Sequence, residues 1–288
     1  MKNTRNNTPT AMIPIANIHP FEGHPYQVRD DEEMAALTES IRDHGIMSPL
    51  ILRPLENTEN EYELISGHRR FRAAQTAGMN EVPAVVVSVT REEAAIMLVD
   101  SNLHREHILP SEKAFAYKLK RDAMVHQGMT SPQLGEKQLT VEKIGADLGD
   151  SKNQVLRYIR LTSLHPDILQ MVDTGKIALT PAVELSYLTP QQQSDLLETM
   201  ECEDCTPSLS QAQQLKKLSQ SGVLNMDMIF GLLRQPKANQ AEKVSFAYSD
   251  LKRYFPKSFS PKDIQNEILK ILEQRYRKRM NQKGIGDR

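Results

Sequence analysis

The sequence predicts an α+β domain on the N-terminal side, an all-α region after it and a basic helical segment at the C-terminal end. Short apolar runs typical of strands alternate with amphipathic helical runs up to about residue 108, and from Pro110 onward apolar residues recur at helical spacing. The last segment, residues 231–288, holds 14 Lys and Arg against 6 Asp and Glu. A chain of 288 residues is long enough for two or three domains.

Strands and helices alternate within the N-terminal domain. Met34, Leu37 and Ile41 lie at helical spacing, which indicates one amphipathic helix. Thr90 can cap a later helix, and Glu93 completes its capping box. We therefore expect strands at residues 12–15, 49–53, 62–65 and 82–89, and helices at residues 30–44, 69–77 and 90–102.

Helical periodicity dominates the rest of the chain. Pro132 and Gly135 predict a loop at residues 128–138, and no element is predicted between residues 222 and 260. Ser260 can cap a last helix that begins with a proline. We expect helices at residues 111–127, 140–148, 151–163, 166–174, 180–188, 190–200, 208–220 and 261–280.

The stretch from Leu64 to Ala74 carries the most chemical information, because a strand-like run ends in a Ser-Gly pair and arginines follow at once. A glycine lets a ligand approach the backbone, and the start of a helix presents unpaired N–H groups to an anion. Arginine supplies paired donors that match phosphate oxygens. We therefore predict a phosphate site formed by Gly67, Arg69, Arg70 and Arg72. The alternative is a surface helix whose arginines are solvated.

The distribution of charge along the chain distinguishes a local site for a small phosphate ligand from a surface that binds the nucleic-acid backbone. Residues 11–104 hold 7 Lys and Arg against 15 Asp and Glu, whereas residues 105–165 hold 10 against 7. Basic segments attract nucleic-acid backbones by releasing counterions, so DNA contact is expected in the middle of the chain and at its C-terminal end. The arginines after Gly67 lie in an acidic domain, which favours a local anion site over a general nucleic-acid surface.

Residues 140–161 have the pattern of a helix-turn-helix. Thr140 is expected to cap the first helix, and Gly145 lies where two helices must approach closely. Gly149 and Asp150 form the turn. The inward-facing residues of the two helices are expected to be Val141, Ile144, Leu148, Val155 and Ile159.

The N-terminal part of the second helix is polar, and Ser151 with Gln154 fits a second capping box. In a recognition helix this part reaches base edges and phosphates, where Asn and Gln can bind adenine and Lys and Arg can bind guanine or phosphate. The alternative is an ordinary helical hairpin with a solvated polar surface. The DNA-binding residues that we expect are Ser151, Lys152, Asn153, Gln154 and Arg157.

Four short segments follow one another along the chain: Pro25-Tyr26-Gln27-Val28-Arg29, Gly67-His68-Arg69-Arg70, Ser101-Asn102-Leu103-His104-Arg105 and Arg160-Leu161-Thr162-Ser163-Leu164. In this order they resemble motifs of the ParB partition protein family. The first three are similar to its Pro-x-Gln-x-Arg stretch and to its Gly-Glu-Arg-Arg and Glu-Asn-x-x-Arg motifs. The last is similar to the segment after its recognition helix. The resemblance runs from about Ile13 to about Leu218.

The resemblance implies a ParB-like domain at residues 11–108, which binds CTP with Mg²⁺, and a helical domain at residues 109–221, which binds a palindromic DNA site. It also implies a homodimer that closes on DNA as a clamp when CTP binds. A ParA-type ATPase would be the partner in segregating a chromosome, plasmid or mobile element. The implied nucleotide-binding residues are Gln27, Arg29, Gly67, His68, Arg69, Arg70, Asn102 and Arg105, and the implied metal-binding residues are Asn102 and Glu106.

Two positions depart from the family pattern. His68 stands where the family has the Glu of one motif, and Ser101 stands where it has the Glu that begins another. Carboxylates suit Mg²⁺ and the positioning of water, whereas His and Ser bind a hard cation poorly. Arg69, Arg70, Asn102 and Arg105 can still bind a triphosphate, so we expect nucleotide binding. The two departures argue against hydrolysis, with weak CTPase activity as the open alternative. No catalytic residue is assigned.

The remaining segments carry weaker predictions. Residues 1–10 are expected to be a disordered tail, and residues 222–288 a linker followed by a helix. The apolar stripe of that helix can pair two subunits or pack on its own chain. Cys202 and Cys205 are interpreted as ordinary thiols of a reducing cytosol, because a zinc site needs four ligands. With no apolar run near the roughly 18 residues of a membrane span, we expect a cytoplasmic protein on the nucleoid or a plasmid.

Two other functions compete with a CTP-dependent partition protein. One is a transcriptional or accessory DNA-binding regulator on the same scaffold without a nucleotide switch, which His68 and Ser101 favour. The other is an enzyme, since ParB-like folds also occur in nucleases and kinases. Against an enzyme, the sequence shows no recognisable nucleophile and no complete set of metal ligands. Nucleotide-dependent closure would separate the first two functions, and turnover of ATP or cleavage of DNA would reveal the third.

Overall fold

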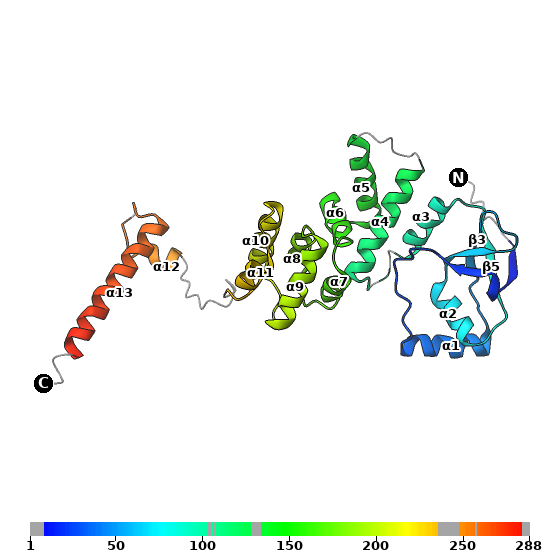
Figure 1. Ribbon diagram of the computed structural model, residues 1–288, viewed down its shortest axis with the longest axis horizontal. Helices are drawn as coiled ribbons and strands as arrows, with labels where there is room; N and C mark the ends of the chain where they lie inside the picture. Colours follow the sequence, from blue (N-terminus) through cyan, green and yellow to red (C-terminus); the bar gives the residue numbers. More distant parts are fainter. Residues whose placement is uncertain are drawn as a thin grey trace. The chain divides into compact units, whose positions relative to one another are not determined.

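We describe the protein from a computed structural model, which places residues 9–102, 105, 107–127, 134–235, 248–256 and 258–283. The chain divides into two compact units, residues 1–235 and residues 236–288. Among the placed residues, the first unit holds a mixed sheet followed by a helical region, and the second holds two helices (Figure 1). This succession confirms the predicted fold class.

The N-terminal sheet is mixed, with β3 at its centre. Antiparallel pairing of β1 with β5 and of β3 with β4 alternates with parallel pairing of β3 with β5 and of β2 with β4. The spatial order is β1-β5-β3-β4-β2. The strands are β1 (Thr10–Pro14), β2 (Ile18–Pro20), β3 (Leu50–Pro54), β4 (Tyr62–Ser66) and β5 (Glu81–Val86).

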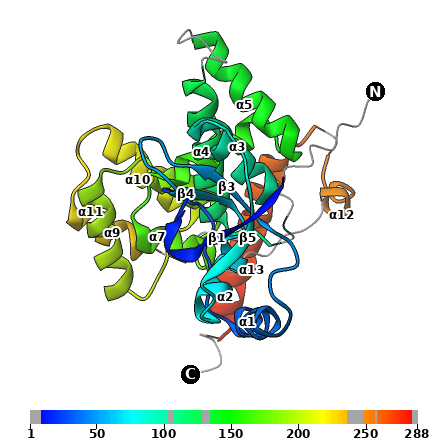
Figure 2. The same ribbon diagram turned by 90° about the vertical axis from the view of Figure 1, so that its right-hand side faces the viewer.

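Different helices cover the two faces of the sheet. Leu52 and Leu64 pack with α1 and α2, whereas their chain neighbours Ile51 and Ile65 pack with α3. This alternation follows from the strand geometry, in which successive side chains point to opposite faces. Figure 2 shows α1 and α2 on one side of the sheet and α3 on the other. The three helices are α1 (Glu32–His44), α2 (His68–Thr76) and α3 (Arg91–Asn102).

The helical region has two apolar cores. A small core joins α4, α5 and α6 through Tyr117, Ile144 and Val155, each fully buried, and a larger core joins the later helices. The helices are α4 (Pro110–His126), α5 (Leu134–Leu148), α6 (Lys152–Leu161), α7 (Pro166–Asp173), α8 (Leu179–Leu185), α9 (Pro190–Cys202), α10 (Leu209–Gln220) and α11 (Met226–Leu233).

Helix α4 connects the sheet domain to the helical region, because it packs against α3 and also against α5, α6 and α7. The backbone N and Oγ of Ser111 donate to Asp173 at the end of α7, at 2.9 and 2.5 Å. The ammonium of Lys120, a residue that is 2% exposed, donates to Asp100 of α3 at 2.7 Å and to Asp147 of α5 at 3.0 Å. One buried charge thus joins three helices.

The start of α5 differs from the prediction. The helix begins at Leu134, so Thr140 is a buried residue inside it and not its N-cap, and the predicted loop at residues 128–138 ends earlier. A Thr before an apolar helical pattern resembles a cap, but the residues that precede it include good helix formers and contain no proline after Pro132. Residues 128–133 lie outside the described part of the chain.

The described part of residues 222–260, for which no element was predicted, contains two helices. Asn225 caps α11 by accepting from the backbone N of Met228 at 2.9 Å, and Ile229 and Leu233 are buried. Its apolar spacing was present in the sequence, but the stretch is short and interrupted by Gly231. The second helix, α12 (Tyr248–Lys252), is a little more than one turn long.

The last helix, α13 (Pro261–Lys283), confirms the predicted start at Ser260. The Ser260 hydroxyl accepts from the backbone N of Asp263, and the carboxylate of Asp263 accepts from the backbone N of Ser260. Ile264 is buried, whereas Leu269, Ile271, Leu272 and Tyr276 are at least half exposed. Among the described residues no helix is long and apolar enough to cross a membrane.

Candidate ligand cavity and nucleic-acid interface

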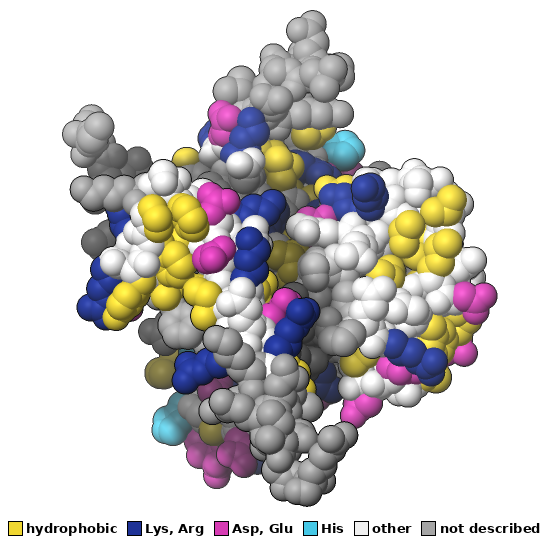
Figure 3. All heavy atoms as spheres, turned by 90° about the vertical axis from the view of Figure 1, so that its left-hand side faces the viewer, with side chains coloured by type: hydrophobic (Ala, Val, Ile, Leu, Met, Phe, Trp, Pro, Cys, Tyr) yellow, Lys and Arg dark blue, Asp and Glu magenta, His cyan; other side chains and the backbone are white. Residues whose placement is uncertain are grey.

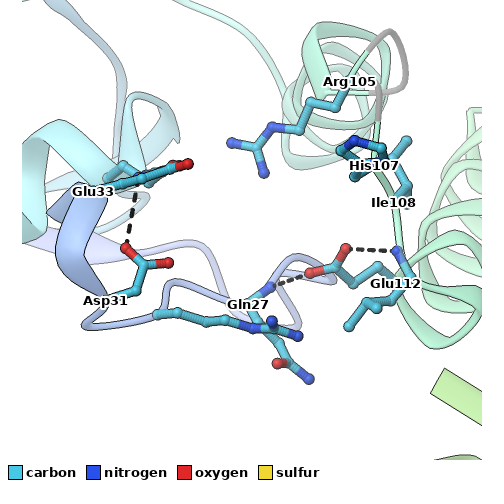
Figure 4. Close-up of a pocket in the computed structure, with 10 residues that line it drawn as sticks. Gln27, Asp31, Glu33, Arg105, His107, Ile108 and Glu112 are labelled. Atoms are coloured by element: carbon cyan, nitrogen blue, oxygen red, sulfur yellow. Dashed lines mark hydrogen bonds and ion pairs between the residues drawn. The ribbon is translucent and has the colours of Figure 1, made fainter. Parts of the chain in front are cut away.

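A cavity of about 570 Å³ opens where the loop after β2, the first turns of α1 and α2, and the segment before α4 meet. This volume lies within the range of small-molecule sites. Figure 4 shows the side chains of Arg105 and Glu33 extending toward each other from opposite walls. The lining residues are Gln27, Arg29, Asp31, Glu33, Arg69, Arg105, His107, Ile108, Leu109 and Glu112.

Gly67 turns the chain from β4 into α2. Its φ of +102° lies in the left-handed region, and a Cβ there would come within 2.5 Å of Leu50 Cδ2. Both the conformation and the space therefore require glycine. Phe71 and Ala74 bury the other side of α2. The sharp turn brings the first turn of α2, with Arg69, to the cavity.

Carboxylates of α1 hold Arg69. Its Nη2 lies 3.1 Å from Glu33 Oε2 and 3.9 Å from Asp31 Oδ1. Asp31 is also the N-cap of α1, because its Oδ1 accepts from the backbone N of Met34 at 2.9 Å. The guanidinium that we expected to bind phosphate is thus already paired within the protein.

Arg105 lies on the opposite wall, with its guanidinium carbon 5.6 Å from the centre of the Tyr26 ring. Tyr26 is 3% exposed, and burial raises the pKa of its hydroxyl. The ring is therefore a fixed, uncharged support against which the Arg105 cation can rest. Among the sequence-predicted residues, the cavity brings together Gln27, Arg29, Arg69 and Arg105.

Glu112 is a cavity residue that the sequence analysis did not identify. It is 8% exposed, its Oε1 accepts from the backbone N of Gln27 at 2.8 Å, and its Oε2 accepts from the backbone N of Leu109 at 3.1 Å. The carboxylate thus fastens the loop after β2 to the start of α4 (Figure 4). Pro110 at the first helical position and Glu at the third are a helix-start pattern that could have indicated it.

Arg70 and Asn102, which were also predicted to bind the nucleotide, make their hydrogen bonds away from the cavity. Arg70 donates to the backbone O of Ser48 and, at 3.0 Å, to that of Pro49, and burial lowers the pKa of its guanidinium. The side-chain amide of Asn102 donates to the backbone O of Leu98 at 2.8 Å. Neither residue lines the cavity. In this arrangement Arg70 stabilises the chain before β3, and Asn102 caps its own helix.

His68 stacks on His24, with ring centroids 3.7 Å apart and planes at 33°. Burial lowers the pKa of His68 to about 3, helped by His24 and Arg105, and burial lowers that of His24 to about 4. Both rings are therefore neutral at ordinary pH. The Nε2 atom of His68 is buried and has no hydrogen-bond partner in the described part of the protein. A neutral ring cannot supply the negative charge of the Glu it replaces.

The described residues do not form a magnesium site. Within the described ranges no three His, Cys, Asp or Glu side chains are grouped so that they could hold a metal ion. The Asn102 amide is bonded within α3, Asp100 pairs with Lys120, and Glu106 lies outside the described residues. The described residues therefore assemble no set of oxygen ligands for Mg²⁺ around Asn102, and the pair Asn102 and Glu106 stays a prediction.

The helix-turn-helix formed by α5 and α6 agrees with the predicted packing. A Cβ on Gly145 would lie 2.4 Å from the backbone O of Asp150, so only glycine permits the approach of the turn. Val141, Ile144, Val155 and Ile159 are buried as expected. The Asp150 carboxylate accepts from Tyr117 Oη at 2.5 Å and Lys113 Nζ at 2.7 Å. Burial would raise the pKa of Asp150, but these two donors outweigh it and hold the pKa low.

The polar residues at the start of α6 are exposed or half-exposed. Ser151 caps the helix by accepting from the backbone N of Gln154 at 3.2 Å. Lys152 pairs with Glu142 at 2.9 Å, and Arg157 donates to Thr180 Oγ1 at 2.6 Å. Leu156, 43% exposed among these polar residues, is a further candidate that sequence reasoning missed. An exposed apolar side chain here suits contact with a thymine methyl group.

Figure 3 shows Lys and Arg side chains interspersed with acidic, apolar and uncharged ones on one face of the protein.

A mixed-sheet domain with an arginine-lined cavity, joined through α4 to a helix-turn-helix, defines the class of this protein. Residues 1–103 match the family model of the ParB N-terminal domain, and residues 124–221 match that of the ParB HTH domain. The chain belongs to the ParB family, which confirms the resemblance seen in the sequence.

Curated relatives support this assignment. The chromosome-partitioning protein Spo0J of Thermus thermophilus is 34% identical over 179 residues, which cover 62% of this chain and 60% of that protein. Stage 0 sporulation protein J of Bacillus subtilis is 34% identical, covering 58% of this chain and 54% of that protein. The nucleoid occlusion protein of Geobacillus thermodenitrificans is 33% identical, covering 54% and 50%. The chain thus matches between half and 60% of the length of these relatives.

Two solved structures of C-terminally truncated ParB from Caulobacter crescentus are more distantly similar to this chain. The one complexed with CTP-γ-S is 23% identical, with a TM-score of 0.32, and covers 65% of this chain and 96% of that chain. The one complexed to the centromeric parS site is 20% identical, with a TM-score of 0.41, and covers 78% and 98%. At these values the ligands of those structures say nothing about the ligands of this chain.

Proposed function

We propose that this protein is a site-specific DNA-binding partition protein whose N-terminal cavity binds CTP. One observation carries the proposal: the chain contains both ParB domains, and a single helix, α4, contacts both of them. Chromosome, plasmid or mobile-element segregation is the process that such a protein would serve. Association with the nucleoid or a plasmid, a homodimer and a ParA-type ATPase partner belong to the same proposal.

DNA binding is assigned to the start of α6. Asn153 and Gln154 have the donors and acceptors that bind adenine in the major groove, and Arg157 is oriented by its bond to Thr180. Ser151 and Lys152 lie at the helix start, where phosphate contacts fix the register of a recognition helix. A palindromic site follows if two copies bind as a symmetric dimer.

Triphosphate binding is assigned to the arginine-lined cavity. Arg29, Arg69 and Arg105 line it from three different segments, so a polyphosphate in its centre could accept donors from several directions. Gly67 keeps the start of α2 open to an anion. His68, Arg70 and Asn102 would act on this site indirectly, by packing and by fixing the chain around it.

Coupling between the two sites is assigned to α4. Glu112, at its start, lines the cavity, whereas Lys113, the next residue, and Tyr117, about one turn further on, hold Asp150 in the turn of the helix-turn-helix. A ligand that moves the loop after β2 would therefore pull on the helix that positions α6. Closure of a dimeric clamp by this movement is the functional consequence that we propose.

Hydrolysis is not part of the proposal. His68 is neutral and stacked, Ser101 Oγ donates to the backbone O of Leu98, and neither supplies a carboxylate for Mg²⁺ or water. Mg²⁺ would accompany CTP through the phosphates themselves. We expect binding with little turnover.

The test is the affinity of the purified protein for CTP, ATP, GTP and UTP with Mg²⁺, measured by calorimetry for the wild type, Arg69→Ala and Arg70→Ala. Selective CTP binding that Arg69→Ala abolishes would support the proposed site. Genomic DNA captured by the wild type should contain one recurring palindrome, and CTP should change its retention on closed DNA circles. Absence of nucleotide binding, with and without that DNA, would reject the switch.

A second function, a DNA-binding regulator without a nucleotide switch, is favoured by His68 and Ser101 and by the relatives named as nucleoid occlusion proteins. It predicts the same specific DNA binding with no effect of any nucleotide on retention. The two functions therefore separate in the same experiment.

A further inference from the structure

Glu33 stands out within the cavity because its carboxylate lies where a ligand anion would be bound. Its Oε2 is 3.1 Å from Arg69 Nη2, and its side chain extends toward Arg105 on the facing wall (Figure 4). Both arginines line the cavity. A negative group of the protein thus already contacts one arginine and faces the other.

Asp31 and Glu33 differ in their freedom to leave Arg69. Asp31 caps α1 by accepting from the backbone N of Met34, and moving it would uncap the helix. The Glu33 side chain is 79% exposed and lies at the second helical position, where a different rotamer would keep its favourable interaction with the helix dipole. Glu33 is therefore the carboxylate that an incoming anion can displace.

Displacement has an energetic consequence. An exposed ion pair contributes little in water, but a ligand that takes over the guanidinium must replace it. A carboxylate that remains nearby would also repel a triphosphate. Removing the charge of Glu33 should therefore strengthen binding of any polyphosphate, with or without a nucleoside.

We propose that Glu33 is an internal competitor for the ligand phosphates, which holds Arg69 in the empty cavity and must be displaced when the ligand binds. This inference rests on the proposed function, because it assumes that a polyphosphate enters this cavity. Glu33 is a specificity-determining residue in this scheme: it raises the ligand charge that is needed to occupy the site.

The chain offers a matched control in Glu32, the residue before Glu33. Both carboxylates lie in the first turn of α1 and both are exposed, but Glu32 does not line the cavity. Glu32→Gln and Glu33→Gln each remove one charge from the same helix end. Their effects on helix stability should therefore match, and thermal unfolding of both variants checks this.

The experiment measures the Kd of the full chain for CTP and for inorganic tripolyphosphate, with the wild type, Glu32→Gln and Glu33→Gln. We expect Glu33→Gln to lower both Kd values about three- to fivefold, and Glu32→Gln to change them less than about twofold. Detectable binding of both ligands by Glu33→Gln, with none by the wild type or Glu32→Gln, would support the inference most strongly.

Three results would overturn the inference: unchanged or weaker binding by Glu33→Gln, an equal gain in Glu32→Gln, or a gain for CTP without one for tripolyphosphate. The last would assign Glu33 to recognition of the nucleoside. If no variant binds either ligand, the proposed nucleotide function itself fails, which is a different outcome from normal binding that Glu33 does not affect.

Discussion

The cavity and the recognition helix both face an expected phosphate partner, but they present their charge differently. In the cavity, Arg69 is paired with Glu33 and Asp31 of the same chain, within a domain that is acidic as a whole. On α6, Asn153 is exposed and Arg157 is oriented by a neutral hydroxyl, that of Thr180. The cavity therefore suits a compact, highly charged anion that can replace a carboxylate, and the helix suits a long partner that binds through many weak contacts.

The two regions also depend differently on glycine. Gly67 and Gly145 each exclude a side chain, but a Cβ at Gly67 would meet the end of a leucine side chain, whereas one at Gly145 would meet a backbone oxygen. A side chain can rotate away, but a backbone oxygen in a tight turn cannot. At Gly67, however, the φ of +102° itself disfavours any other residue, whereas at Gly145 the exclusion comes from the close backbone oxygen alone.

The largest effect is expected for Gly145→Ala. A Cβ 2.4 Å from Asp150 O must push α5 and α6 apart, and we expect a loss of about 2–4 kcal/mol of unfolding free energy and of specific DNA binding. Urea unfolding and DNA retention measure the two losses. Gly231→Ala is the control, because Gly231 lies inside α11 with no atom within 4 Å of a new Cβ, and it should be neutral or stabilising. Wild-type DNA binding by Gly145→Ala would contradict the prediction.

The connection through Lys120 is expected to show the next largest effect. Asp100→Asn combined with Asp147→Asn leaves a buried ammonium without a carboxylate and should cost about 2–4 kcal/mol of unfolding free energy. Lys120→Met should cost less, because the two carboxylates, each nearly half exposed, can be hydrated instead. Denaturant unfolding of the wild type, the double variant and Lys120→Met gives the order. A more severe loss in Lys120→Met would contradict this order, because it would mean that leaving the two carboxylates without the ammonium costs more than leaving the ammonium without them.

The stacked histidines make stability depend on pH. Their pKa values in the folded protein, about 3 and about 4, lie below the unfolded value of 6.5, so that the unfolded chain takes up protons first as the pH falls. Stability is therefore fully present above pH 6.5 and declines toward pH 4, by at most about 1.4 kcal/mol per pH unit for each histidine. We expect about 1–2 kcal/mol between pH 6.5 and pH 5.5. The double variant His24→Gln, His68→Gln should flatten this slope in unfolding titrations; an unchanged slope would assign it to other groups.

The smallest effect is expected for Tyr117→Phe. It removes the hydrogen bond to Asp150 but leaves the bond from Lys113, so we expect a loss of about 1 kcal/mol of unfolding free energy. If α4 carries the coupling between the two regions, nucleotide affinity should stay the same while the effect of nucleotide on DNA retention falls. Measuring both on one preparation separates a coupling role from a purely stabilising one.

The sequence by itself determined the local structure. Alternating apolar residues in the strands, the cap at Ser260, the glycine between α5 and α6 and the buried Val155 and Ile159 all follow from periodicities and helix-end rules that act over a few residues. These same rules misplaced the start of α5 and missed α11, because a threonine inside a helix looks like a cap and a short helix with a glycine gives a weak pattern.

Only the tertiary structure decided which charged groups meet. Arg69 meets Glu33 across 36 positions of sequence, Gln27 meets Glu112 across 85, and Lys120 meets Asp147 across 27. No local pattern encodes such pairs, because the packing of the sheet against α1, α3 and α4 sets the distance between them. The sequence therefore predicted a phosphate site and a DNA-binding helix, and the fold determined that Arg69 is paired with carboxylates and that α4 contacts both regions.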